Sequence, residues 1–161
     1  MSVRVRLVPM TEAEFDLYEQ AEAQEYAAEN IRAGYWAEDE AIERARESHR
    51  MLLPQGVATP GHHFCHLIDA GSEARVGAVW WFENREGRAP RAFVYHIVIE
   101  PQLRRRGYGS AALAGVEAQA RALGMAAVGL HAFAHNPEAI RVYEALGFRT
   151  TSLNMLKPLH P

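Results

Sequence analysis

The sequence lacks several features that mark specialised protein classes. It has a single cysteine, Cys65, among 161 residues, which excludes an internal disulfide and a cysteine-rich zinc site. No apolar run approaches the roughly 18 residues that a membrane helix needs. The first residues, Met-Ser-Val-Arg-Val-Arg-Leu, lack the apolar stretch of a secretory signal. We therefore expect a cytoplasmic protein that does not contact a membrane.

Net charge is also small, at −3, which argues against a nucleic-acid partner. The charge is nevertheless unevenly distributed. Residues 1–90 carry nine Lys/Arg against sixteen Asp/Glu, a net of −7, whereas residues 91–161 carry eight against four, a net of +4. Such an asymmetry indicates ligands of opposite sign. The simpler interpretation of the acidic half is two helices with solvated acidic faces.

Length and patterning predict one domain, residues 1–161, because no linker or repeat interrupts an average globular composition. Alternating or β-branched runs predict strands at residues 3–7, 62–68, 75–82, 92–99, 126–133 and 150–156. Thr11 and Glu14 form a potential capping box for a first helix, in which Leu17, Tyr18, Ala21 and Ala28 would fall on one face. Helices are also predicted over 38–52, up to Gly124, and from Asn136. This order predicts an α/β (α+β) fold with a mixed sheet and helices on both faces.

One segment carries most of the chemical information. The strand at 92–99 leads through three arginines and two glycines into a helix. Gly107 and Gly109 have no Cβ, so a phosphate could approach the backbone at the helix N-terminus, where unpaired N–H groups and a partial positive charge favour an anion. The loop lacks the Gly-Lys-Ser/Thr that ends a Walker A loop, which argues against a nucleoside triphosphate as the ligand. It fits the Rossmann pattern only formally, because no acidic residue is placed where ribose recognition needs one. Coenzyme A would use both the backbone amides and the arginines.

These residues resemble the GNAT superfamily of acetyl-coenzyme-A-dependent N-acetyltransferases. The family's coenzyme motif, Gln/Arg-x-x-Gly-x-Gly/Ala, is matched by Arg104-x-x-Gly107-x-Gly109. On its N-terminal side the family has an apolar triplet and a proline, matched by Ile97-Val98-Ile99 and Pro101. On its C-terminal side the matching residues are Asn136, Tyr143 and Gly147-Phe148. The resemblance covers roughly residues 92–148. It implies a GNAT-like, mostly antiparallel sheet of six to seven strands with about four helices.

The resemblance also implies residue roles. The backbone at Ile97, Val98 and Ile99 would bind the pantetheine arm and the thioester carbonyl. Asn136 would contact the cofactor arm, and Tyr143 would act as general acid beside the sulfur. No metal is expected. The loop residues that would wrap the pyrophosphate are Arg104, Arg105, Arg106, Gly107, Tyr108, Gly109 and Ser110.

The general base is less directly indicated. Some family members that acetylate ribosomal proteins carry a Glu shortly before the Asn, whereas this sequence has His131 five residues before Asn136. An imidazole, with an ordinary pKa of about 6.5, is a competent base at neutral pH. A half-exposed strand histidine explains His131 equally well. Tyr95 and Glu100 are alternative candidates that would act through water.

The expected activity is transfer of the acetyl group from acetyl-CoA to a primary amine, by direct attack in a ternary complex. The alternatives are a CoA-binding regulatory module without turnover and, more distantly, a nicotinamide-binding oxidoreductase. In this family the first two helices commonly shape the acceptor pocket. An acidic, aromatic mouth would favour a cation such as a small amine or a peptide N-terminus. Its candidate residues are Tyr35, Trp36, Glu38, Asp39, Glu40, Trp80 and Trp81. Dimers are frequent in the family, so a homodimer is compatible with the sequence.

Overall fold

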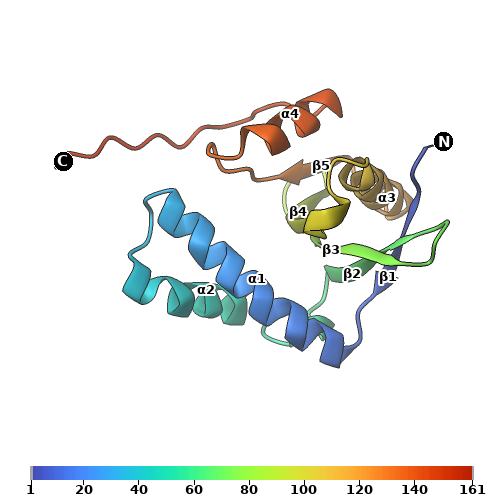
Figure 1. Ribbon diagram of the computed structural model, residues 1–161, viewed down its shortest axis with the longest axis horizontal. Coiled ribbons are helices and arrows are strands. Elements are labelled where there is room, and N and C mark those ends of the chain that lie inside the picture. The colour runs from blue at the N-terminus through green and yellow to red at the C-terminus, as the bar shows by residue number, and fades with distance from the viewer. Residues whose placement is uncertain (1, 161) are drawn as a thin grey trace.

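The computed structural model describes residues 2–160, in which five strands form one mixed sheet and helices pack against it (Figure 1). The strands run in the spatial order β1-β2-β3-β4-β5, antiparallel except for the parallel pair β4 and β5. The elements are β1 (Val5–Pro9), α1 (Glu12–Arg32), α2 (Glu38–Leu52), β2 (His62–Asp69), β3 (Arg75–Asn84), β4 (Arg91–Ile99), α3 (Tyr108–Ala122), β5 (Ala127–Leu130) and α4 (Pro137–Ala145), with short 3-10 turns at Gly56–Ala58 and Pro101–Leu103. The predicted mixed, mostly antiparallel α/β fold is confirmed.

Helices cover both faces of the sheet, as predicted. On one face, Leu113 and Val116 of α3 pack against Trp81 of β3, all three being fully buried. On the other face, Phe15 of α1 packs against Phe64 of β2, with ring centroids 4.6 Å apart. A third cluster of alanines joins α2 to the outer side of α1. Burial of apolar surface on both faces therefore fixes the sheet between two helical layers.

The strand count differs from the prediction. The part of the chain that the structure describes has five strands in the sheet rather than six to seven, and residues 150–156 form no strand. These residues come after α4 as an extended chain with exposed side chains. Their sequence favours β-structure, but a strand forms only where a neighbouring strand accepts its backbone hydrogen bonds.

The buried face of α1 also differs from the prediction. Thr11 and Glu14 form the expected capping box. Leu17 is 72% exposed, however, and Ala23 and Ala27 are buried instead. Tyr18 packs against the core as predicted, but Ala21 and Ala28 are exposed, so the helical period was correct and its phase was wrong for most of the predicted face. The reason is that α1 packs on α2 as well as on the sheet, and small alanines allow the two helices to approach closely.

Candidate active site

The sheet opens between β4 and β5. The two strands pair from Arg91↔Ala127 to Val94↔Leu130, and β4 then continues to Ile99 after β5 has ended. A bulge lies at the same point, because Trp80 pairs with His96 and Trp81 with Val94, which leaves Tyr95 as the extra residue. A bulge re-aims side chains and ends regular pairing. Beyond it, backbone groups of Ile97–Ile99 on the β5 side can bind a ligand in place of a strand.

A cleft of about 870 Å³ lies along this opening. The predicted cofactor residues that line it are Ile97, Val98, Ile99, Arg104, Arg105, Gly107, Tyr108, Gly109, Ser110 and Asn136. Arg106 is the member of the predicted set outside this lining. The structure therefore brings together residues from β4, from the loop after it and from the start of α4.

The cleft fits a phosphate-bearing ligand at its loop end. Gly107 caps α3 with a φ of 87°, in the left-handed region that glycine adopts without strain. A Cβ placed on Gly109 would meet no atom within 4 Å, so space is left beside the first turn of the helix. Arg104 Nε donates to the Ile99 carbonyl at 3.0 Å, which ties the loop to the end of β4. Arg105 reaches Glu138 of α4 at 3.2 Å. A helix N-terminus beside arginines is a set of groups that can bind a phosphate.

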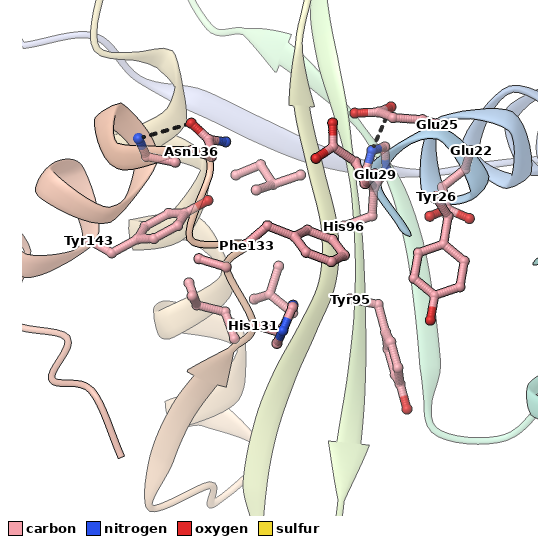
Figure 2. A pocket seen from close by; sticks show the side chains of 15 residues that line it. Glu22, Glu25, Tyr26, Glu29, Tyr95, His96, His131, Phe133, Asn136 and Tyr143 are labelled. Carbon is pink, nitrogen blue, oxygen red and sulfur yellow. Dashed lines mark hydrogen bonds and ion pairs between the residues drawn. The ribbon is translucent and has the colours of Figure 1, made fainter. Parts of the chain in front are cut away.

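A smaller pocket of about 150 Å³ adjoins the cleft (Figure 2). Both predicted catalytic residues line it: Tyr143 comes from α4 and His131 lies directly after β5. Burial raises the pKa of the Tyr143 hydroxyl, so it remains protonated at neutral pH. The residues that line both cavities are Glu25, Glu29, Ile97, Asn136, Ala139 and Tyr143. The two cavities are therefore continuous across these side chains.

Three carboxylates of α1 form one wall of the pocket. Glu22, Glu25 and Glu29 are spaced three and four residues apart, which places them on one helical face. Each contacts a histidine from another element (Figure 2 shows the contact of Glu25). These contacts join Glu22 to His49 of α2, Glu25 to His96 of β4, and Glu29 to His135 in the segment before α4. Sequence reasoning missed this row, although its spacing on a predicted helix is a signal that could have revealed it.

The histidine contacts also set the charges of the wall. The hydrogen bond from His96, at 3.0 Å, lowers the pKa of Glu25 although partial burial opposes it, so this carboxylate is ionised at neutral pH. Burial alone would lower the pKa of His49, but its contacts with Glu22 and Glu19 outweigh burial, and the pKa is raised. Glu25 therefore contributes a negative charge to the pocket wall, whereas the raised pKa of His49 favours a positive charge beside Glu22.

The acidic and aromatic residues expected at the acceptor mouth lie elsewhere. Residues 38–40 are exposed in the first turn of α2, where acidic side chains stabilise the positive end of the helix dipole. Trp80 and Trp81 are buried in the two different cores on either face of the sheet. Instead, the pocket has aromatic walls formed by Tyr26, Tyr95 and Phe133.

The candidate bases differ in whether their side chains line the pocket and in whether the atoms that would accept a proton already make hydrogen bonds. His96 has both ring nitrogens in contact, with Tyr18 at 2.7 Å and Glu25 at 3.0 Å. His131 packs edge-on against Phe133 and has no side-chain hydrogen bond among residues 2–160. Tyr95 lines the pocket and stacks on Trp80 at 4.6 Å, with its pKa raised by burial. Glu100 lines neither cavity. Of the sequence-derived candidates, His131 therefore combines proximity with a free ring nitrogen.

Metal ligands and membrane-spanning helices are both absent from the described part of the chain. No group of three or more His, Cys, Asp or Glu side chains within residues 2–160 is arranged to hold a metal ion. No helix in the same range is long and apolar enough to cross a bilayer.

Comparison with known proteins gives consistent matches along nearly the whole chain. The acetyltransferase (GNAT) family matches residues 16–148. Two uncharacterised N-acetyltransferases of Bacillus subtilis (strain 168) are similar over nearly their whole lengths. YdgE is 31% identical over 95% of this chain and 97% of its own length, and YycN is 34% identical over 96% and 99%.

Solved structures show the same relationship. The crystal structure of YycN from Bacillus subtilis superposes with a TM-score of 0.91 at 34% identity, covering 98% of this chain and 99% of that one. An aminoglycoside N-acetyltransferase, AAC(6')-Iy, solved in complex with CoA, superposes with a TM-score of 0.63, covering 98% and 96% of the two chains. Its identity is only 14%, so this match concerns the fold alone.

Proposed function

This chain belongs to the acetyltransferase (GNAT) family, and from that premise we propose that it acetylates a primary amine that enters the acidic pocket as a cation. The coenzyme would occupy the cleft along β4, and the acceptor would occupy the pocket between α1 and the segment after β5. The main supporting observation is that the two cavities meet at Ile97, Asn136 and Tyr143. A reaction between two bound substrates needs such a shared boundary.

The acceptor amine must lose a proton before it reacts, because an alkyl ammonium has an ordinary pKa of about 10.4. We assign this proton to a free ring nitrogen of His131, which lines the pocket and makes no side-chain hydrogen bond within residues 2–160. The neutral amine nitrogen then forms a bond to the thioester carbonyl carbon. Backbone N–H groups of β4 beyond the bulge would stabilise the negative charge that develops on the carbonyl oxygen.

Collapse of this arrangement breaks the bond between carbon and sulfur. The electron pair of that bond leaves with the sulfur, and the Tyr143 hydroxyl supplies a proton to the departing thiolate. The raised pKa of Tyr143 keeps that proton on the hydroxyl until the thiolate forms. The attacking nitrogen gives its extra proton to the Tyr143 phenolate, and the proton on His131 returns to solvent. The products are the N-acetylated amine and coenzyme A with a free thiol.

A cationic acceptor is favoured by the pocket's charge and walls. Glu25 and Glu29 face both cavities, so they would hold a positive group at the point of reaction. The aromatic rings of Tyr26, Tyr95 and Phe133 provide apolar contact for the carbon chain and faces for a cation. The acceptor class we propose is therefore a slender alkyl amine with at least one further positive charge, rather than an anionic amine.

A matched pair of acceptors tests this proposal. We expect 1,4-diaminobutane to have a kcat/KM at least about tenfold above that of 4-aminobutanoate, which shares its chain length but carries a remote carboxylate; tenfold corresponds to about 1.4 kcal/mol. The measurement is amine-dependent release of the coenzyme A thiol. Equal rates or a preference for 4-aminobutanoate would reject the cationic acceptor and leave acetyl transfer itself intact.

Cofactor binding and acetyl transfer can be measured separately on the same protein. Stabilisation against heat by acetyl-CoA and by CoA, without thiol release in the presence of any amine, would favour the regulatory alternative. Stabilisation by NAD alone would reject the proposed cofactor.

Because the cofactor cleft and the pocket share one sheet, the geometry also supports a single acetyltransferase domain over residues 1–161.

A further inference from the structure

Lysine is nearly missing from this sequence. Among the 17 lysine and arginine residues, Lys157 is the one lysine. The two residue types carry the same charge, but they differ as acceptors of an acetyl group. An arginine guanidinium stays protonated in proteins, whereas a lysine amine can lose its proton and act as a nucleophile. Besides its N-terminal amine, the chain therefore has a single group that acetyl transfer to an amine could modify.

Lys157 lies in a part of the chain that is open to solvent. Residues 150–158, which follow α4, form no helix or strand, and their side chains are exposed (Figure 1). Leu156 before the lysine and Leu159 after it are 64% and 84% exposed. A segment with so few buried contacts leaves the protein surface at little cost in free energy. The Lys157 side chain is therefore free to enter a binding site.

The same segment is held close to the two cavities. The Leu156 side chain lies beside Gly34, 3.7 Å from the position that a Cβ on this glycine would occupy. Gly34 follows the C-terminal end of α1, and Figure 1 shows the end of the chain passing that end of the helix. Glu29, five residues before Gly34, lines both cavities, and Arg32 lines the larger one. The contact of Leu156 thus places Lys157 near the rim of the proposed active site.

The lysine side chain is long enough to span the remaining distance. Five residues of helix correspond to about 7.5 Å, which is the separation of Gly34 from Glu29 along α1. From the Cα of Leu156 to the amine of Lys157, one Cα–Cα step contributes about 3.8 Å and the four-carbon stem roughly 6 Å. The amine therefore has the reach to arrive at the boundary of the two cavities while Leu156 stays beside Gly34.

We propose that Lys157 is a self-acetylation site, whose amine enters the acidic pocket of its own chain and accepts the acetyl group there. This inference rests on the acetyl transfer proposed above. Ionised Glu25 would attract the ammonium, and the rings of Tyr26 and Tyr95 would contact the apolar stem. A lysine brings only one positive charge. Its attachment to the chain compensates, because a short flexible tether gives an effective concentration in the millimolar range.

The chemical step is the same as for a free acceptor. The ammonium of Lys157 gives a proton to His131, and the neutral nitrogen forms a bond to the thioester carbonyl carbon. The carbon–sulfur bond breaks, its electron pair leaves with the sulfur, and Tyr143 protonates the thiolate. The attacking nitrogen then gives its extra proton to the Tyr143 phenolate. The product is a neutral amide, which the carboxylates no longer attract, so each chain accepts one acetyl group and the pocket becomes free again.

Mass spectrometry of the full chain tests the proposal. The purified protein is incubated with acetyl-CoA that carries a heavy-isotope acetyl group, and the acetylated residues are located by peptide mapping. We expect one acetyl group per chain, on Lys157. Tyr143→Phe should lower the rate of this modification about a hundredfold, the factor expected for loss of a general acid.

A relocated lysine provides the matched control. The variant combines Lys157→Arg with Arg88→Lys, so that the chain again has one lysine, now in the exposed turn before β4. Six residues of β4, or about 20 Å, separate Arg91 at the start of this strand from Ile97 at the cavities. We expect Lys157 to be acetylated at least about tenfold faster than the relocated lysine. Equal rates, or faster modification of the N-terminal amine, would mean simple chemical acetylation and would overturn the proposal.

Two further measurements separate the possible failures. If 1,4-diaminobutane is acetylated and Lys157 is not, self-acetylation is wrong and the proposed function stands; if neither is acetylated, both are wrong. The second measurement mixes the Lys157→Arg chain as the enzyme with the Tyr143→Phe chain as the substrate. We expect no faster acetylation of Lys157 than in the Tyr143→Phe chain alone. Rapid transfer between the two chains would contradict acetylation within one chain.

Discussion

The His96 ring nitrogen Nε2 lies 3.0 Å from a carboxylate oxygen of Glu25, and this contact joins β4 to α1 where the larger cleft meets the smaller pocket. His96 pairs with Trp80 beside the bulge that opens the sheet, so the bulge aims the imidazole at α1. The same backbone irregularity thus leaves part of β4 unpaired, where we propose that the coenzyme binds, and anchors one acidic residue of the pocket.

Glu25→Gln should raise the KM for a cationic acceptor about tenfold, because a charged hydrogen bond is typically worth about 1.5–3 kcal/mol and part of it survives in the amide. The KM for an anionic amine should fall or stay constant. Glu40→Gln removes the same charge from the exposed first turn of α2 and serves as the control. Equal effects of the two substitutions would remove Glu25 from acceptor binding.

Tyr143→Phe should lower kcat by about a hundredfold, within the range typical of general acid catalysis, and leave the Kd for acetyl-CoA nearly unchanged. The Tyr143 and Phe148 ring centroids lie 5.9 Å apart, and a phenylalanine ring keeps this core contact. Stopped-flow detection of the released thiol measures the chemical step. Unchanged turnover would exclude this tyrosine from the mechanism.

His131→Ala should slow attack by the amine and abolish the acidic limb of the pH–rate profile, where activity rises as the base loses its proton. The residue is exposed and makes no side-chain hydrogen bond among residues 2–160, so the melting temperature should hardly change. Profiles of kcat/KM between about pH 5 and 9 for the two proteins provide the comparison. Superimposable profiles would contradict the base assignment.

Gly77→Ala should destabilise the protein strongly, by about 3 kcal/mol or more, because a Cβ there would lie 2.0 Å from the Val98 carbonyl oxygen. Relief of this clash would move β3 away from β4 next to the cofactor strand. Gly129→Ala is the matched control, since its Cβ would make only ordinary contact with Phe93, at 3.6 Å. Urea unfolding of both variants measures the difference, and similar midpoints would show that β4 accommodates the change.

Cys65 should resist alkylation in the folded protein at about pH 8, because burial raises its pKa to about 11 and leaves almost no thiolate. Reactivity should appear only as the chain unfolds or as the pH approaches that value. Thiol-reactive dye kinetics in buffer and in denaturant test this. Fast labelling of the native chain would mean that β2 opens readily, and would also compromise thiol-release assays.

The sequence was sufficient for the elements whose signals are local. The capping box at Thr11, the cap by Asn136 and the bounds of α2 depend on neighbouring residues, and the structure has them as predicted. The conformation of the loop proposed to bind phosphate was also predictable, because the positive φ of Gly107 at the start of α3 is a local feature. These features identified the family and the candidate cofactor residues without a structure.

Tertiary structure alone decided the walls of the proposed acceptor pocket and the conformation of residues 150–156. The row of Glu22, Glu25 and Glu29 becomes a pocket wall only because α1 crosses the opening between β4 and β5, and helical phase is set by what a helix packs against. The segment at residues 150–156 has strand propensity but no partner strand among residues 2–160 of its own chain, and pairing is a property of two strands rather than of one. Local sequence therefore determined the loop that we propose binds phosphate, and long-range packing determined which residues face it.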